Sequence, residues 1–263
     1  MDDEVLYRVD DGVAVITLNR PERLNAWTPP LQTQYFDRLA QAASARDVGA
    51  VVVTGAGRGF CPGADMEYLQ GLDGAGPARP DTRPTTFPLT VQKPMIAAIN
   101  GACAGIGLVQ ALMCDVRFAA AGAKLTTAFS RRGLIAEHGS SWLLPRLVGT
   151  SRALDILLSA RVFTGEEAFE LGIVNRALPP EQVLPEALAY ARDLALNCSP
   201  AAMATIKSQI YRHATVDLDT ARRESDRLMA ASLAGPDFKE GVASFVEKRL
   251  PAFAPLGEVT TFD

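Results

Sequence analysis

Two glycine-rich segments carry the clearest capacity for chemistry in this sequence. They span residues 54–65 and 100–107, and each follows a short apolar run. A glycine turn that enters a helix leaves backbone N–H groups without partners at the positive end of the helix dipole. Two such turns side by side could direct N–H groups at one developing oxyanion. The simpler interpretation is that the glycines only permit tight packing of strand against helix.

The first segment also raises the question of a nucleotide site. Its glycines have the spacing G-x-G-x-G, at Gly55, Gly57 and Gly59, and Pro62 interrupts any helix there. A dinucleotide fingerprint requires G-x-G-x-x-G opening directly into a helix, and a P-loop requires a following Gly-Lys-Ser/Thr. Neither pattern is met, so the sequence argues against both types of nucleotide binding.

Composition excludes several classes of protein. The 263 residues are 48% hydrophobic, and 26 basic side chains face 30 acidic ones for a net charge of −4. Disorder, nucleic-acid binding and attachment to anionic membranes are therefore disfavoured. The N-terminus is acidic without an apolar signal core, and the most apolar stretch, 95–113, is interrupted by Asn100, Gln110 and glycines. We expect a soluble, cytoplasmic protein with neither a nucleic-acid nor a membrane partner.

Cysteine and histidine content argues against a metal or disulfide framework. The cysteines show no C-x-x-C spacing, and the two histidines lie far apart in the sequence. We therefore expect reduced, packed thiols and no metal site. The residues concerned are Cys61, Cys103, Cys114, Cys198, His138 and His213.

The elements that must position the glycine segments alternate between strand and helix. Asp10-Asp11-Gly12 predicts a hairpin turn, and Thr28 before two prolines predicts the start of a helix that runs to about Ala45. Unbroken apolar runs predict buried strands. This alternation favours an α/β layer architecture. The predicted strands are residues 5–9, 13–18, 50–54 and 95–99.

The rest of the chain divides into a loop and a helical tail. Residues 71–90 contain three glycines and four prolines, which predicts a long surface loop without regular structure, either functional or a plain connector. From residue 139 onward the chain is predicted to be mostly helical. Thr164 with Glu167 forms a capping box. Further helices are predicted at 181–196, 201–211, 218–233 and 238–247.

Several motifs together resemble the crotonase, or enoyl-CoA hydratase/isomerase, superfamily. They are NRPERLNA at 19–26, FCPGAD at 60–65, AING at 98–101 and MCD at 113–115, with further similarity through 142–149 and 163–175 to FVEKR at 245–249. The resemblance covers essentially the whole chain. It implies a crotonase-like α/β spiral of ββα units over residues 1–198. It also implies a C-terminal helical trimerisation domain over 199–263, and a homotrimer or dimer of trimers.

The resemblance implies an acyl-CoA thioester substrate, so coenzyme A is part of the substrate and no separate cofactor is expected. The backbone N–H groups of Ala64 and Ile106 would form the oxyanion hole, each contributing about 3 kcal/mol. Asn25 is expected to hold its loop, and Arg23 has the alternative of a solvated surface role. The positions expected to border CoA are Arg23, Leu24, Ala26, Asp65 and Met66.

The proton-transfer positions depart from the hydratase pattern. Hydratases of this superfamily use two glutamates, and the corresponding positions here hold Val109 and Phe129, which cannot transfer protons. Glu137 instead matches the acid that the family's double-bond isomerases use. An apolar pocket lined by Val109 and Phe129 is expected to raise the pKa of Glu137 toward that of a useful base. His138 lies beside it, as a further pocket residue or a loop-orienting one, while Asp65 and Asp115 are expected to be structural.

Isomerisation with Glu137 as acid and base is therefore the function that the sequence favours. Three alternatives stay open at this point. They are hydration by Glu137 and a water, hydrolysis of the thioester in the same oxyanion hole, and binding of acyl-CoA without catalysis. The acyl chain itself is not predicted, because the pocket wall includes the loop at 71–90.

Overall fold

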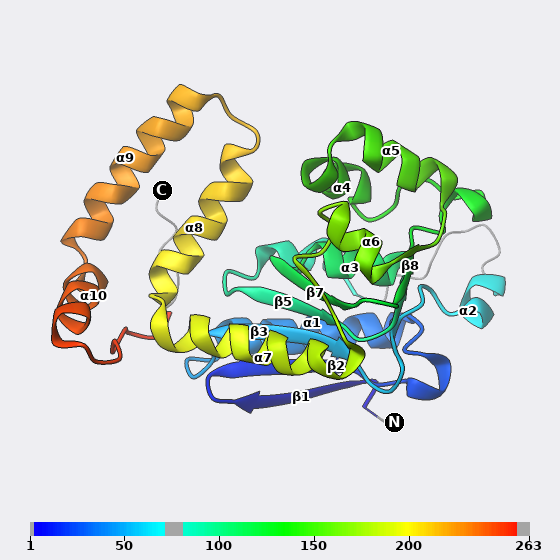
Figure 1. Cartoon of the computed structure of the whole chain (residues 1–263), viewed down its shortest axis with the longest axis horizontal. Helices are drawn as coiled ribbons and strands as arrows, with labels where there is room; N and C mark the ends of the chain where they lie inside the picture. The colour runs from blue at the N-terminus through cyan, green and yellow to red at the C-terminus, as the bar shows by residue number, and fades with distance from the viewer. Residues whose placement is uncertain (1–2, 72–80, 257–263) are drawn as a thin grey trace.

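The computed structural model describes residues 3–71 and 81–256, which form two sheets flanked by helices (Figure 1). The larger sheet has the strand order β1-β2-β3-β5-β7-β10 and the smaller one the order β4-β6-β8-β9. The strands of the larger sheet are β1 (Val5–Asp10), β2 (Val13–Leu18), β3 (Ala50–Gly55), β5 (Met95–Ile99), β7 (Val116–Ala120) and β10 (Arg176–Leu178). Those of the smaller sheet are β4 (Gly59–Cys61), β6 (Ala102–Ala104), β8 (Lys124–Thr126) and β9 (Phe163–Thr164).

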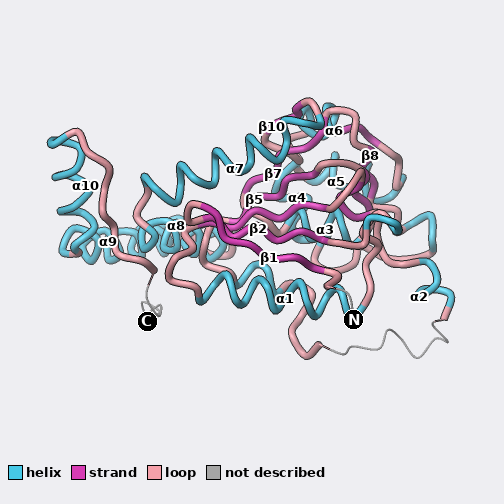
Figure 2. Tube along the Cα trace, turned by 90° about the horizontal axis from the view of Figure 1, so that it is seen from below, coloured by secondary structure: helices cyan, strands magenta, loops and turns pink. Residues whose placement is uncertain are grey.

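Helices cover both faces of the larger sheet. Figure 2 shows α1 and α7 on opposite faces, while α3 to α6 gather around the smaller sheet (Figure 1). The helices are α1 (Pro29–Ser44), α2 (Met66–Gln70), α3 (Ile106–Leu112), α4 (Ser140–Val148), α5 (Thr150–Ser159), α6 (Gly165–Glu170), α7 (Pro180–Asn197), α8 (Pro200–His213), α9 (Leu218–Ala234) and α10 (Pro236–Glu247). Three 3-10 turns join them: η1 (Pro21–Arg23), η2 (Phe87–Thr90) and η3 (Ser130–Arg132).

The sequence signals for the front of the chain correspond closely to these elements. β1 and β2 pair antiparallel from Val5↔Leu18 to Asp10↔Val13, and the turn residues Asp11 and Gly12 have φ values of +48° and +76°. The Thr28 hydroxyl accepts from the Leu31 N–H at 3.2 Å and begins α1. β3 and β5 are buried along their whole length, as parallel strands covered on both faces must be. The α/β prediction is confirmed.

Other expectations were wrong in detail. The prolines predicted no regular structure over residues 71–90, but residues 87–90 form η2. Pro88 lies in the first turn of η2, a position that proline suits. The helical tail is interrupted by β9 and β10, which add to the two sheets. Half of the predicted capping box is present: the Thr164 hydroxyl accepts from the Glu167 N–H at 3.1 Å, while the Glu167 carboxylate pairs with Arg161 Nη1 at 2.6 Å. Residues 72–80, in the middle of the predicted loop, lie outside the described residues.

The last three helices extend away from the sheets on the side opposite α2 (Figures 1 and 2). α8 begins just after α7, close to residue 199, where the sequence analysis expects the C-terminal domain to begin; this division into domains stays a prediction. Contacts that fasten α8 to the rest of the fold come from Lys207 and Tyr211. Lys207 Nζ lies 2.7 Å from Asp115 Oδ2 and donates to the Lys93 carbonyl at 3.3 Å, and the Tyr211 ring stacks on Trp142 with centroids 6.3 Å apart. The ion pair confirms the structural role expected for Asp115.

Within the described residues, no helix is long and apolar enough to cross a membrane. The same part of the chain has no group of three or more His, Cys, Asp or Glu side chains placed to hold a metal ion. All four cysteines are free thiols, and Cys61, Cys103 and Cys114 are buried.

Candidate active site

Two turns, which we call the paired turns (residues 62–64 and 104–106), follow the neighbouring parallel strands β4 and β6. Gly63 has a φ of +108°, and Gly105 has φ +50° with ψ −126°, conformations that L side chains rarely adopt. A Cβ on Gly63 would lie 3.3 Å from the Ala104 carbonyl oxygen, and one on Gly105 would lie 3.7 Å from Gly63 Cα. The two glycine-rich segments singled out in the sequence are therefore in contact.

The paired turns place two backbone N–H groups beside each other. Trp27 N–H donates to Gly63 O at 2.8 Å, and Asp65 N–H donates to Trp27 O at 2.9 Å, so the Ala64 N–H points away from Trp27. Ile106 is the first residue of α3, where an N–H has no partner within the helix. Among the described residues neither N–H donates a hydrogen bond. Both N–H groups are therefore unengaged within the described residues.

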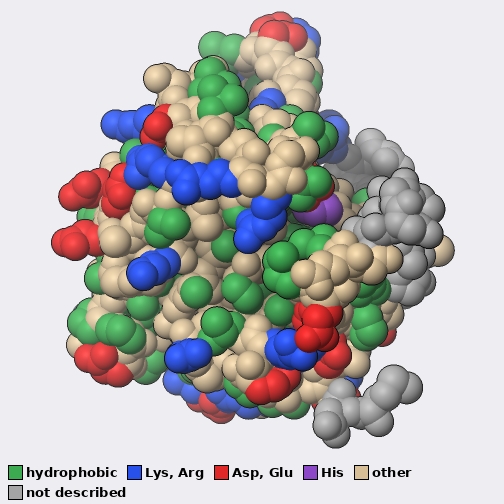
Figure 3. Space-filling model, turned by 90° about the vertical axis from the view of Figure 1, so that its right-hand side faces the viewer, with side chains coloured by type: hydrophobic (Ala, Val, Ile, Leu, Met, Phe, Trp, Pro, Cys, Tyr) green, Lys and Arg blue, Asp and Glu red, His purple; other side chains and the backbone are tan. Residues whose placement is uncertain are grey.

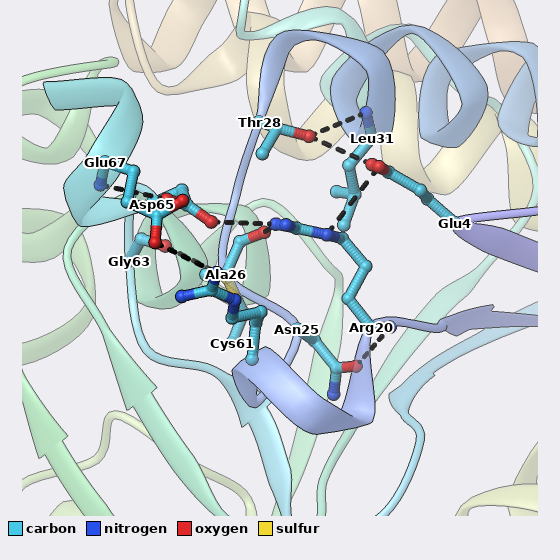
Figure 4. Close-up of polar contacts among 11 residues, drawn as sticks. Glu4, Arg20, Asn25, Ala26, Thr28, Leu31, Cys61, Gly63, Asp65 and Glu67 are labelled. Atoms are coloured by element: carbon cyan, nitrogen blue, oxygen red, sulfur yellow. Dashed lines mark hydrogen bonds and ion pairs between the residues drawn. The ribbon is translucent and has the colours of Figure 1, made fainter. Parts of the chain in front are cut away.

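Arg20 holds the chain on both sides of the first of these turns (Figure 4). Its Nη1 donates to the Ala26 carbonyl at 2.7 Å and to Asp65 Oδ2 at 3.1 Å. Asp65 also caps α2, because its Oδ1 accepts from the Glu67 N–H at 3.0 Å. Burial alone would raise the pKa of Asp65, but the Arg20 hydrogen bond and backbone N–H donors hold that pKa below its usual value. The cap predicted for Asp65 is confirmed.

Asn25 ties the preceding loop to the glycine segment. It is fully buried, its Oδ1 accepts from the Arg20 N–H at 2.8 Å, and its Nδ2 donates to the carbonyls of Ala56 at 3.0 Å and Gly59 at 2.8 Å. All of these contacts are internal, so the expectation that Asn25 holds the loop is confirmed. Arg20 is the functional residue that the sequence reasoning missed. The signal available was an arginine followed by Pro21 in a motif that also contains a buried asparagine.

The positions predicted to border CoA divide into two groups. Ala26 and Asp65 are buried, and their oxygens already bond Arg20. Arg23, Leu24 and Met66 lie nearer the surface, and Arg23 Nη2 is paired with Glu67 Oε1 at 2.9 Å. A ligand phosphate would have to compete with that exposed carboxylate for the arginine. Figure 3 shows a face on which Lys and Arg side chains are interspersed with acidic and apolar ones.

Val109 and Phe129 are part of the hydrophobic core. Val109 lies in α3 and Phe129 directly before η3, and both are buried. A Cβ on Gly105 would be 3.9 Å from Phe129 Cε1, so this ring lies directly beside the paired turns. The two positions where the resemblance places hydratase glutamates are thus occupied by apolar residues that also have apolar surroundings.

Glu137 comes from a loop that we call the Glu137 loop (residues 133–139). Its backbone has positive φ at Gly133, His138 and Gly139. The Glu137 side chain is 32% exposed, and partial burial raises the pKa of its carboxyl above the usual value, as the sequence predicted. His138 Nε2 lies 3.6 Å from Glu137 Oε2. The loop leads into α4, where the Ser140 N–H donates to the Glu137 carbonyl at 3.0 Å.

The chain is similar to known proteins of one family. The chain matches the enoyl-CoA hydratase/isomerase family model over residues 8–255. It is 37% identical over 261 residues to a 1,2-epoxyphenylacetyl-CoA isomerase from Escherichia coli strain K12, covering 95% of this chain and 97% of that one. A solved enoyl-CoA hydratase from Mycobacterium marinum is 51% identical, with a TM-score of 0.71 over 82% of this chain and 100% of that chain. A probable enoyl-CoA hydratase/isomerase from Mycobacterium abscessus is 30% identical, with a TM-score of 0.89 over 96% and 99%.

The two sheets, the C-terminal helices and the structural neighbours define the crotonase fold class. The chain belongs to the enoyl-CoA hydratase/isomerase family and is an enzyme of that family. The family and fold inferred from the sequence motifs are confirmed.

Proposed function

We propose that this enzyme moves the double bond of a 3-enoyl-CoA thioester, with Glu137 as the acid and base. The observation that carries the proposal is the combination of two available N–H groups on the paired turns with a partly buried carboxylate on the Glu137 loop. Val109 and Phe129 at the alternative acid positions support the same conclusion, because neither can accept a proton.

The reaction proceeds in two proton transfers. The Glu137 carboxylate removes a proton from C2, and the electron pair of that C–H bond moves onto the thioester oxygen as an enolate. The N–H groups of Ala64 and Ile106 stabilise this oxyanion. The protonated Glu137 then returns the proton to C4, which binds it with the electron pair of the C3–C4 double bond. At the same time the enolate oxygen becomes a carbonyl again, and the C1–C2 electron pair forms the new double bond between C2 and C3. No atom is gained or lost, and no cofactor is required beyond the CoA carried by the substrate.

The CoA portion binds along the loop that leads to the first of the paired turns. Arg23 would exchange its exposed partner Glu67 for a phosphate of CoA, a bidentate contact that an arginine makes well. Leu24 and Met66 would contact the pantetheine and adenine. Asp65 and Ala26 would act through Arg20, by holding the turn that presents Ala64.

Hydration of a 2-enoyl-CoA is the second candidate. The partial exposure of Glu137 favours it, because water can reach the carboxyl. The name of the Mycobacterium marinum relative, an enoyl-CoA hydratase, supports the same alternative. In this reaction Glu137 would activate the water that adds at C3, and the proton would be delivered to C2.

Steady-state turnover of a 3-enoyl-CoA and a 2-enoyl-CoA, wild type beside Glu137→Gln, tests the proposal. We expect conversion of the 3-enoyl substrate, reduced by about 10²- to 10⁴-fold in the variant, with thioester binding retained. Turnover of the 2-enoyl substrate alone would indicate that the enzyme catalyses hydration and not isomerisation. Release of free CoA would indicate a thioesterase. Binding without any turnover would indicate an acyl-CoA binder.

We further propose a homotrimer or a dimer of trimers, assembled through residues 199–263. The support is the number of large apolar side chains exposed on α8 to α10. Light scattering during gel filtration should give three or six times the chain mass of 28.1 kDa. A monomer at micromolar concentration would contradict the proposal. The exposed side chains include Ile206, Ile210, Leu218, Met229, Phe238, Val242, Phe245 and Val246.

A further inference from the structure

Two buried polar atoms close to the Glu137 loop have no hydrogen-bond partner among the described residues. They are Oε1 of Gln110, a residue 3% exposed, and Oγ of Ser140, a residue that is fully buried. Buried polar atoms are nearly always paired, and leaving one unpaired costs about 1–3 kcal/mol. A partner outside the chain would remove that cost at both atoms.

The orientation of the Gln110 amide follows from its one protein contact. Its Nε2 donates to the Thr85 carbonyl at 3.2 Å. Because a carbonyl only accepts, the amide nitrogen must face Thr85, and the atom left over is an acceptor. The Ser140 hydroxyl can both donate and accept. The two side chains together therefore suit a group that can both donate one hydrogen bond and accept one.

Both residues lie on elements that carry or adjoin the groups of the proposed reaction. Gln110 lies four residues after Ile106 on α3, hence on the same helix face and about 6 Å further along the axis. Ser140 begins α4, which contacts α3, and its N–H bonds the Glu137 carbonyl at 3.0 Å.

Two consecutive threonines connect the positions. Thr85 holds Gln110, and a Cβ on Gly139 would lie 3.5 Å from Thr86 Cγ2. Gln110 and the start of α4 are thus joined by one short segment.

We propose that Gln110 and Ser140 form a polar subsite of the acyl pocket that takes a hydroxyl group carried on the acyl chain. The hydroxyl donates to Gln110 Oε1 and accepts from Ser140 Oγ. Val109 and Phe129 are apolar, so hydrogen bonds to the acyl chain would be confined to the place that faces Gln110 and Ser140. The inference rests on the proposed function for the thioester itself and narrows its substrate class to oxygenated acyl groups.

A matched substrate pair tests the subsite. We expect wild-type kcat/KM for 6-hydroxy-3-hexenoyl-CoA to exceed that for 3-hexenoyl-CoA by about tenfold or more, since a site built to bond a hydroxyl rejects the analogue without it. Gln110→Leu should remove or reverse that ratio, and Ser140→Ala should reduce it. Gln182→Leu, at an exposed position of α7, is the matched control and should leave the ratio unchanged.

Binding of the saturated thioesters separates this inference from the proposed reaction. We expect 6-hydroxyhexanoyl-CoA to bind wild type more tightly than hexanoyl-CoA in calorimetry, and the two to bind Gln110→Leu alike. If wild type binds 6-hydroxyhexanoyl-CoA more tightly but turns over neither enoyl substrate, the proposed isomerase reaction would be overturned and the proposed subsite would stand. Equal binding of the pair by wild type would overturn the subsite. So would a ratio unchanged in both variants, which would mean that the two atoms hold only a structural water. If Gln110→Leu fails to fold, Ser140→Ala and Ser140→Gly decide between these outcomes.

Discussion

The paired turns and the Glu137 loop contribute to the same proposed reaction but are built differently. The paired turns offer backbone atoms, held by buried contacts to Arg20 and Asn25. The Glu137 loop offers a side chain, and its neighbours Leu134 and Ile135 are 40% and 80% exposed. Backbone donors tolerate a change of side chain, as Ile106 illustrates, whereas the reaction depends on which side chain the loop presents. One fold can therefore support several reactions on the same class of thioester.

Within the paired turns, the largest effect should come from removing one backbone donor. Ile106→Pro deletes the N–H at the first position of α3, where proline is well tolerated by a helix. We expect kcat to fall by about 10²- to 10³-fold, the loss typical of one oxyanion donor. Ile106→Ala keeps the N–H and loses only the side chain, so its kcat should remain far closer to wild type. Equal losses of kcat in the two variants would show that the Ile106 N–H is not a donor of the proposed oxyanion hole.

The next largest effect concerns the close packing of the paired turns. A Cβ on Gly107 would lie 2.4 Å from the Cys61 carbonyl oxygen and 2.7 Å from its Sγ. We expect Gly107→Ala to destabilise the fold by about 3 kcal/mol, which lowers Tm by about 2–4 °C for each kcal/mol. Gly122→Ala, where a Cβ meets nothing within 4 Å, is the control and should leave Tm nearly unchanged. A stable Gly107→Ala would show that β4 and α3 are less tightly coupled than their contact indicates.

A smaller loss is expected at the loop that precedes the first turn. Asn25→Ala leaves the carbonyls of Ala56 and Gly59 and the Arg20 N–H without partners, so unfolding in urea should require about 2 kcal/mol less. Asn197→Ala, at an exposed position at the end of α7, should change that free energy little. An Asn25→Ala protein as stable as wild type would mean that water replaces these hydrogen bonds.

The smallest effect is a dependence of stability on pH at the Glu137 loop. Because burial raises the pKa of Glu137 above its ordinary 4.5, the folded state holds this proton more tightly than the unfolded chain does. The stability that Glu137 contributes therefore falls as pH rises from 4.5 through the raised pKa. Glu137→Gln should have a slightly higher Tm than wild type at pH 7, and the difference should vanish below pH 4.5. A lower Tm for the variant at pH 7 would indicate that the charged carboxylate is stabilised, for example by His138.

Much of the fold could be predicted because the relevant signals are local. The hairpin turn, the Thr28 and Thr164 caps and the continuous apolar runs of β3 and β5 each specify their own element. Strands of two or three residues, such as β4 and β9, are too short for any periodicity to appear. They are defined by their partners, so the sequence could not reveal them.

The sequence predicted the candidate residues of the site but not the residues that hold them in position. Motifs placed Ala64, Ile106 and Glu137 as candidates, because those segments resemble a known family. The role of Arg20 depends on Asp65, which is distant in sequence, and no local pattern links the two. The unpaired atoms of Gln110 and Ser140 follow only from how α3, α4 and residues 85–86 pack together.

The stacking of Trp142 on Tyr211 has a spectroscopic consequence. The chain has two tryptophans, and they report on different junctions. Trp27 is buried against Tyr35 and bridges to Ala64, so its emission follows the first of the paired turns. Trp142 stacks with Tyr211 of α8, and the guanidinium carbon of Arg146 lies 3.9 Å from the centroid of its ring. Trp142→Phe would therefore leave Trp27 alone, whose fluorescence follows the first of the paired turns. Trp27→Phe would leave Trp142 alone, whose fluorescence follows the docking of α8.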